Sequence, residues 1–228
     1  MPAAGAASPL APPAAPSAPP APPPRSAPLP LSAPPSLAVR VEGRSGPDAT
    51  FDPGRWLASP TPAELRLLAR ARGPVLDVGC GPGRHVLALA RRGVVAMGID
   101  ITPGVVALAR HRGASVLERS VFGPVPGLGR WATVLLLDGN LGIGAEPAAL
   151  LARVGELLAP GGQVLAEVAG TATGPRRVRL EQAGVAGPWF RWADVDRAAV
   201  ATTPAGLGVL ERWVDEGREF LCLERRGP

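Results

Sequence analysis

The sequence predicts a doubly wound α/β domain whose seven-stranded sheet is mostly parallel and ends in an antiparallel strand. Three observations predict this fold. Strand-like and helix-like segments alternate between residues 61 and 168, a glycine-rich turn follows the first of these strands, and two further strands close the chain as a hairpin. Such alternation is typical of a parallel sheet with helices on both faces.

Residues 1–40 differ in composition from the rest of the chain, because they contain roughly half of its 29 prolines. Proline fixes φ and removes a backbone donor, so a Pro/Ala tract should be extended and disordered. We expect a passive tail or upstream sequence from a misassigned start codon, with a docking tract for a proline-recognition module as the alternative. The folded domain then spans 41–228.

The elements of the domain follow from local signals. Thr61-Pro62-Ala63-Glu64 combines a cap, a proline at the first helical position and an acid three residues after the cap, which indicates a helix over 63–71. Apolar periodicity and Gly/Pro turns predict the remaining elements. We expect strands at 75–78, 94–99, 115–118, 132–137 and 163–168, and helices at 84–92, 102–110 (capped by Thr102) and 147–158, with a turn at Pro160-Gly161-Gly162 before the fifth strand.

The pattern changes after residue 168. Residues 176–181 and 188–193 can pair as a hairpin, and residues 194–202 resemble a short helix. Strands at 208–213 and 218–224 form the final hairpin. Segment 169–193 is therefore a candidate insertion on the side of the domain where a substrate enters.

Composition limits the class of protein. Hydrophobic residues make up 46% of the chain and aromatic residues 4%, with no Tyr or Lys, so the core must consist of Val, Leu and Ala. The net charge of +5 comes without an arginine stripe interleaved with aromatics, which gives no strong nucleic-acid signal. Two cysteines, Cys80 and Cys222, make no disulfide framework, and no apolar run is long enough to span a membrane. We expect a cytoplasmic protein.

The segment that carries chemistry is Val75-Leu76-Asp77-Val78-Gly79-Cys80-Gly81-Pro82-Gly83-Arg84, at a strand-to-helix turn. A dinucleotide fingerprint would need G-x-G-x-x-G, but the third glycine comes one residue early and Arg84 stands in its place. No Gly-Lys-Ser/Thr is present for a P-loop. The D-x-G-x-G-x-G form instead resembles motif I of class I S-adenosylmethionine (SAM)-dependent methyltransferases, which have a Rossmann-like fold.

The resemblance covers residues 61 to about 168 and is to small-molecule-type bacterial members. It implies SAM as cofactor, with the glycine loop beneath its methionine part. Asp100, at the end of the second strand, would accept the ribose hydroxyls. Ser120 stands where the family commonly has an Asp for the adenine, and Val121 and Phe122 could flank the ring. The exit of the fourth strand would face the methyl group, and it lacks the Asn/Asp-Pro-Pro-Tyr/Phe motif of enzymes that methylate base or glutamine nitrogens. The expected cofactor residues are Asp77, Gly79, Cys80, Gly81, Gly83, Asp100, Ile101, Ser120, Val121, Asp138, Gly139 and Asn140.

Other reactive or aromatic residues have competing interpretations. Cys80 lies inside the loop, where small side chains are needed, and this steric requirement explains the cysteine better than a nucleophilic role does. His85 could be a general base, although a capping or solvent-facing role accounts for it better, and His111 suits a helix C-terminus. These residues have no metal-ligand spacing, so no metal is expected. The candidate acceptor-binding residues are Trp56, Trp189 and Trp192, and Glu167 is a further polar residue late in the fifth strand.

Methyl transfer from a sulfonium is an in-line displacement, so the protein need only orient acceptor and cofactor. An oxygen acceptor can require a base, whereas nitrogen, sulfur and carbon acceptors do not all need one. The sequence therefore favours a SAM-dependent methyltransferase acting on a small-molecule acceptor. The alternatives are an RNA or protein methyltransferase and a non-catalytic SAM-fold binding protein, and a nicotinamide-dependent enzyme is disfavoured by the glycine spacing.

Overall fold

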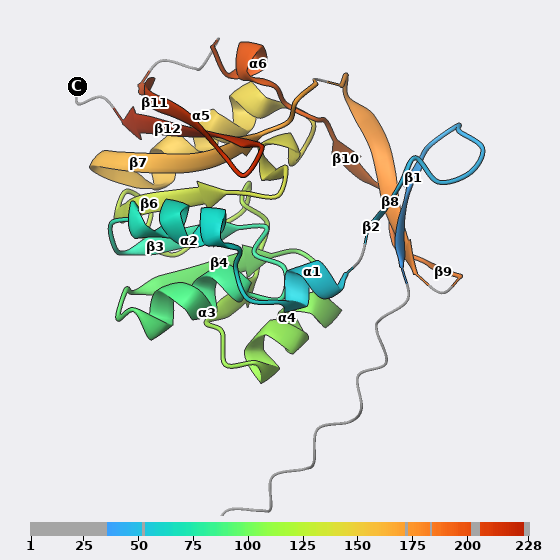
Figure 1. The fold of residues 1–228 in the computed structure, drawn as a ribbon, viewed down its shortest axis with the longest axis horizontal. Helices are drawn as coiled ribbons and strands as arrows, with labels where there is room; N and C mark the ends of the chain where they lie inside the picture. The colour runs from blue at the N-terminus through green and yellow to red at the C-terminus, as the bar shows by residue number, and fades with distance from the viewer. Residues whose placement is uncertain (1–35, 52, 172, 183, 202–205, 226–228) are drawn as a thin grey trace, which may run out of the picture. The chain divides into compact units, whose positions relative to one another are not determined.

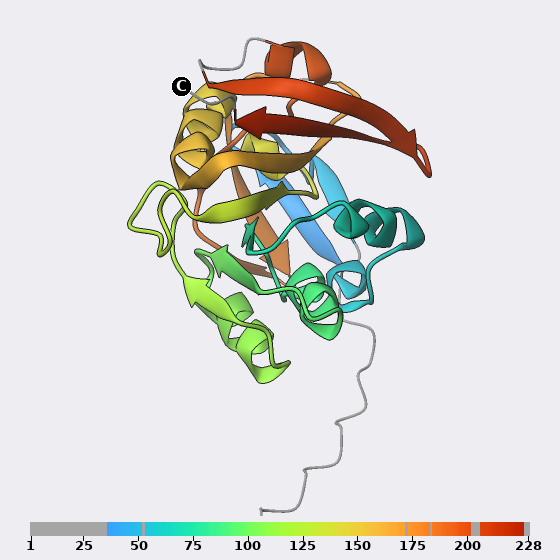
Figure 2. The ribbon, with the colours of Figure 1, turned by 90° about the vertical axis from the view of Figure 1, so that its left-hand side faces the viewer.

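The computed structural model describes residues 36–51, 53–171, 173–182, 184–201 and 206–225, which form two sheets with their helices (Figure 1 and Figure 2). Residues 1–35, which hold most of the expected tail, and Thr202, where a helix was expected to end, lie outside the described residues.

The main sheet has seven strands in the order β11-β12-β7-β6-β3-β4-β5. Strands β7, β6, β3, β4 and β5 pair in parallel, and β12 pairs antiparallel with both β7 and β11. The predicted fold class is therefore confirmed. The strands are β3 (Val75–Val78), β4 (Ala96–Asp100), β5 (Val116–Glu118), β6 (Trp131–Leu136), β7 (Leu158–Val168), β11 (Leu207–Asp215) and β12 (Arg218–Arg225).

Helices cover both faces of this sheet, because successive side chains of each strand point to opposite faces. In β6, Val134 packs in one apolar cluster with Leu150 of α5, and its neighbour Leu135 packs in another with Leu67 of α2. The helices are α1 (Gly54–Leu57), α2 (Pro62–Ala69), α3 (Arg84–Arg91), α4 (Pro103–His111), η1 (Asn140–Gly142), α5 (Pro147–Leu157) and α6 (Arg197–Ala201). None of the helices in the described part of the chain is long and apolar enough to cross a membrane.

For most of these elements, the bounds expected from the sequence lie within two or three residues of the observed bounds. The capping box of α2 is present: Thr61 Oγ1 accepts the N–H of Glu64, and Glu64 Oε2 accepts the N–H of Thr61. Two expectations were wrong. The side chain of Thr102 makes no capping hydrogen bond to α4. The Pro-Gly-Gly turn at 160–162 lies within β7, because β7 already pairs with β6 at Leu158 and bulges before pairing again.

A second, antiparallel sheet was not predicted. Its order is β10-β8-β1-β2, and β9 pairs with β8. The expected hairpin at 176–193 is present as the pairing of β8 with β10, but β8 also pairs with β1 near the start of the described chain. The folded part therefore begins by Leu37, and the expected tail boundary at residue 40 is too late. The strands are β1 (Leu37–Val41), β2 (Ala49–Phe51), β8 (Arg176–Gln182), β9 (Val185–Ala186) and β10 (Phe190–Trp192).

Candidate SAM-binding site

The glycine loop joins β3 to α3 at the carboxyl edge of the main sheet. Gly79 has φ +70°, and a Cβ there would lie 2.7 Å from Asn140 Nδ2, so a side chain would displace Asn140. At Gly81 (φ +54°) a Cβ would have no atom within 4 Å. The loop is therefore tightly packed at Gly79 and open beside Gly81. A ligand that lies against the loop backbone needs such an open side.

Asp100 lies beside this loop as predicted. Its Oδ2 accepts the N–H of Gly81 at 3.1 Å, and its Oδ1 accepts the N–H of Thr102 at 2.9 Å. A carboxylate has about four acceptor positions, so both oxygens can still accept hydroxyl protons. Thr102 is therefore bound to Asp100 through its backbone N–H, and its side chain makes no capping bond to α4.

The side chain of Cys80 points away from the open side of the loop. It is buried against Gly98 of β4, where an added Cβ would lie 2.4 Å from Cys80 Sγ. Burial raises the pKa of the thiol, and the charges of Asp77 and Asp100 raise it further. Cys80 is therefore a packing residue whose backbone alone borders the loop, in agreement with the small-residue interpretation.

The segment after β5 lies next to exposed apolar side chains. Ser120 Oγ accepts the N–H of Phe122 at 3.2 Å and so shapes the turn. Val121 is 3% exposed and belongs to the main core, which removes its side chain from the expected pair around a ring. Phe122 and Ile101 are exposed (47% and 61%), and Phe122 packs over Gly144.

The exit of β6 continues as Asp138-Gly139-Asn140 and contacts the glycine loop directly. Asn140 Nδ2 donates to the carbonyls of Val78 (2.8 Å) and Gly79 (3.1 Å). Asp138 has φ +54°, a left-handed conformation that is uncommon outside glycine. These two loops, expected to face the same ligand, are therefore one hydrogen-bonded unit.

A buried network of charged side chains lies behind both loops. Arg84 donates to Glu64 (2.7 Å) and Asp138 (2.6 Å). Arg218 of β12 donates to Glu64 at 2.6 Å and makes two bonds to Glu167 at 2.8 and 2.7 Å. Burial alone would raise the pKa of Glu64, but its hydrogen-bond donors and cations outweigh burial and hold that pKa well below its usual range.

His85 adds a third cationic group to this network. Its Nδ1 lies 3.5 Å from Asp77 Oδ2 and its Nε2 lies 3.9 Å from Glu64 Oε2. Burial alone would lower the pKa of His85, but the two carboxylates raise it to about 9. With this pKa we expect the imidazole to be charged at neutral pH. The side chain is buried, so the expected capping or solvent-facing role was wrong.

Glu64, His85 and Asp138 offer ligand atoms within 4.8 Å of one another, a clustering that the sequence did not indicate. Arg84 is bound to both carboxylates of this group. The geometry is thus that of a carboxylate–guanidinium network. Asp77 Oδ2 and His85 Nε2, both buried, make no hydrogen bond among the described residues.

Comparisons with known proteins agree with this geometry. A family model described as "Methyltransferase domain" matches residues 75–162, from the start of β3 into β7. A SAM-dependent methyltransferase from Bacteroides fragilis, solved with S-adenosyl-L-homocysteine, has a TM-score of 0.72 at 24% identity and covers 85% of this chain and 89% of that one. The chain therefore contains a methyltransferase domain over residues 75–162 and has the fold of class I SAM-dependent methyltransferases.

Two curated relatives illustrate the range of the family. The chain is 30% identical to a trans-aconitate 2-methyltransferase of Paracidovorax citrulli over 62% of its own length. It is 42% identical to a mouse ATP synthase lysine N-methyltransferase over 21% of its length. The chain spans 57% of the length of the first relative and 19% of the length of the second.

The residues of this chain fit SAM. The space beside Gly81 offers room for a ligand, and the fixed carboxylate of Asp100 offers acceptors for its hydroxyls. Asp77, expected among the cofactor residues, is buried, and its Oδ2 faces His85 Nδ1 at 3.5 Å. Gly83 serves packing instead, because a Cβ there would lie 2.7 Å from Ala114 Cβ.

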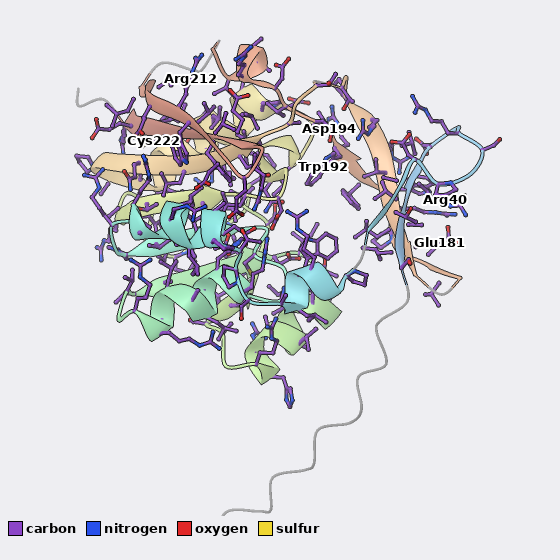
Figure 3. The ribbon with its side chains drawn as sticks, viewed as in Figure 1. Arg40, Glu181, Trp192, Asp194, Arg212 and Cys222 are labelled. Carbon is purple, nitrogen blue, oxygen red and sulfur yellow. The ribbon has the colours of Figure 1, made fainter. Side chains whose placement is uncertain are left out.

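The three candidate tryptophans are separated by the fold. Trp192 lies against the exit loop, where it bridges to Ile143, and Figure 3 shows it with Asp194 between the two sheets. Trp189 lies on the opposite face of the second sheet, stacked with Arg179 at 4.9 Å. Trp56 is on α1, which Arg112 holds at the glycine loop by donating to the carbonyls of Leu57 (2.7 Å) and Pro82 (3.1 Å).

Sequence reasoning missed the network as a feature of the site. The sequence indicates Glu64 as a capping residue and Arg84 as a break in the glycine spacing, but no local signal pairs the two. Arg218 had no local signal, because its partner Glu64 lies 154 residues away in the chain.

Proposed function

We propose that this chain binds SAM and transfers its methyl group to a small-molecule acceptor. The observation that carries the proposal is that the glycine loop and the β6 exit loop are hydrogen-bonded to each other. Asp100 binds the glycine loop, and Trp192 pairs with the exit loop at Ile143. A cofactor on the first loop and an acceptor at the second would then share one edge of the sheet, which is where ligands of such sheets bind.

SAM, when bound, supplies an activated methyl group, so the protein contributes orientation and charge. Asp100 would hold the ribose, and the loop backbone would lie against the methionine part. Trp192 and the apolar face of the second sheet would exclude water from the acceptor. This face presents Val41, Val178 and Phe190, which are neighbours by strand register.

Two observations favour a small acceptor over RNA or protein. The matches to trans-aconitate 2-methyltransferases extend over 62% and 83% of this chain, whereas the match to the mouse lysine N-methyltransferase covers 21%. On the outer face of the second sheet, Arg40 pairs with Glu181 at 2.9 Å (Figure 3). Arg177 pairs with Glu42 at 2.7 Å. We also propose a reducing compartment such as the cytoplasm, since Cys80 and Cys222 are free thiols.

Calorimetric titration with SAM and with S-adenosylhomocysteine tests the proposal. Wild type should bind both ligands, Gly81→Arg should bind neither because its side chain fills the open side of the loop, and Asp100→Ala should bind at least about tenfold more weakly because it loses charge-assisted hydrogen bonds. Asp48→Ala, which removes a carboxylate of a surface ion pair, is the matched control and should bind as wild type does.

Absence of saturable binding by the folded wild type would refute the cofactor assignment. If binding holds, incubation with methyl-labelled SAM and fractionated metabolites, against purified RNA and protein as parallel arms, identifies the acceptor class. Label transferred to RNA or protein alone would overturn the small-molecule proposal.

A further inference from the structure

Arg84 has no role in the function proposed above, although it interrupts the glycine spacing of the motif. We propose that Arg84 is a positioning residue that holds Asp138 in its left-handed conformation and so locks the β6 exit loop onto the glycine loop. The inference rests on the proposed SAM site, because that locked pair of loops is the surface that would receive the cofactor.

The position of Arg84 is not explained by helix electrostatics. It is the first residue of α3, where a helix dipole favours negative rather than positive groups. Its side chain is nevertheless 3% exposed and lies between two carboxylates, those of Glu64 and Asp138. A planar guanidinium can bridge two acids in this way, whereas an ammonium acts as one point charge.

The shortest contact of the Asp138 side chain is the one with Arg84. Its Oδ2 accepts from Arg84 at 2.6 Å, whereas the other cations near it, Arg55 and Arg218, lie 3.4 and 3.5 Å from Oδ1. Its backbone N–H donates to Glu167 Oε2 at 2.8 Å. A strained φ of +54° persists only where surrounding contacts hold it, and these two bonds hold both the side chain and the backbone of Asp138.

The conformation of Asp138 determines where Asn140 lies. Two residues after Asp138, the amide of Asn140 reaches the carbonyls of Val78 and Gly79 and fills the space that a Cβ at Gly79 would occupy. If Asp138 left its left-handed conformation, the direction of the chain would change and these two hydrogen bonds would be lost. Arg84 thus acts on the glycine loop through Asp138 and Asn140.

Glu64 would remain paired if Arg84 were removed. It also accepts from Arg218 (2.6 Å) and from the N–H of Thr61 (2.8 Å). The loss of Arg84 therefore removes the shortest contact of Asp138 and leaves it with Arg55 and Arg218 at 3.4 and 3.5 Å.

The first test needs no ligand. The side-chain amide signals of Asn140, assigned by their loss in Asn140→Asp, are followed by NMR in wild type, Arg84→Lys and Arg91→Met. Arg91→Met is the matched control, because Arg91 is an exposed arginine in the last turn of the same helix. We expect shifted or broadened Asn140 signals in Arg84→Lys and unchanged ones in Arg91→Met. Unchanged signals in Arg84→Lys, a conservative variant chosen so that the protein folds, would overturn the proposal.

The second test measures S-adenosylhomocysteine binding by calorimetry in Arg84→Met, Asp138→Asn and the double variant. Arg84→Met should weaken binding at least about tenfold, since it leaves a partly buried carboxylate without its close cation. Asn carries no charge and tolerates the left-handed conformation, so the double variant should recover at least about threefold of that loss. Additive losses would overturn the positioning role. Wild type that binds nothing would refute the SAM site, while the Asn140 signals would still report on the Arg84 contact.

Discussion

Replacing His85 by Gln should remove most of the pH dependence of stability between pH 6.5 and about 8.5. The imidazole is buried on α3 between Asp77 of β3 and Glu64 of α2, with Arg84 as the neighbouring cation. Asp138 offers an oxygen within 4.8 Å of the same imidazole, and Arg218 of β12 pairs with Glu64, Asp138 and Glu167. In the folded protein the two nearest carboxylates raise the pKa of His85 from 6.5 to about 9, against the effect of burial.

The sign follows from proton linkage. A raised pKa in the folded state stabilises the protein fully below the unfolded pKa, and that stabilisation is lost as the pH rises through the folded pKa. With values of 6.5 and about 9, His85 contributes about 3 kcal/mol at pH 6.5 and about 1 kcal/mol at about pH 8.5. The free energy of unfolding of wild type should therefore fall by about 2 kcal/mol across this window because of His85.

Few other side chains of this protein titrate between pH 6.5 and about 8.5. The chain has no Lys or Tyr and two His, and the ordinary pKa of a thiol lies near the upper end of the window. Urea unfolding of wild type, His85→Gln and His111→Gln at pH 6.5, 7.5 and about 8.5 gives the three curves, and His111 is the matched control because it is exposed.

His111→Gln should keep the slope of wild type, and His85→Gln should lose it, whatever the change in overall stability. Parallel curves for wild type and His85→Gln would refute the reasoning. In His111→Gln, NMR titration of the remaining imidazole should give a midpoint near 9, and a midpoint near 6.5 would contradict the assigned charge state.

Three further outcomes are expected. Thr61→Ala should lower the free energy of unfolding by about 1 kcal/mol in urea titrations, since the capping box of α2 is lost, and Thr61→Ser should restore it. Gly79→Ala should weaken S-adenosylhomocysteine binding at least about tenfold in calorimetry, because its Cβ would lie 2.7 Å from Asn140 Nδ2, and unchanged affinity would contradict the close packing of the two loops. Cys80 and Cys222 should react with a thiol reagent at neutral pH only after denaturant is added, because burial raises both pKa values, and rapid reaction of the native protein would show the site to be open.

Local sequence signals were sufficient for the elements of the main sheet. The cap at Thr61, the glycine turn after Val78 and the acid at Asp100 each depend on residues a few positions apart, and local preference decides such features. The glycine loop and Asp100 were therefore predictable, and the structure joins them through the bond from the N–H of Gly81.

The bulge in β7 was not predictable in the same way. Pro160-Gly161-Gly162 has the composition of a turn, and only the pairing of Leu158 with Trp131 keeps that segment in the strand. Tertiary pairing here overrides the local preference for a turn.

The sequence by itself determined the order of strands and helices, the glycine loop and the class of cofactor, because these depend on contiguous residues. The tertiary structure alone decided the second sheet and the charged network. Leu37 pairs with Gln182, and Arg218 pairs with Glu64. Among 24 arginines and 19 acids, no local signal distinguishes one such pair from another. These contacts form only when folding brings segments that are distant in the chain together, and local preferences do not encode them.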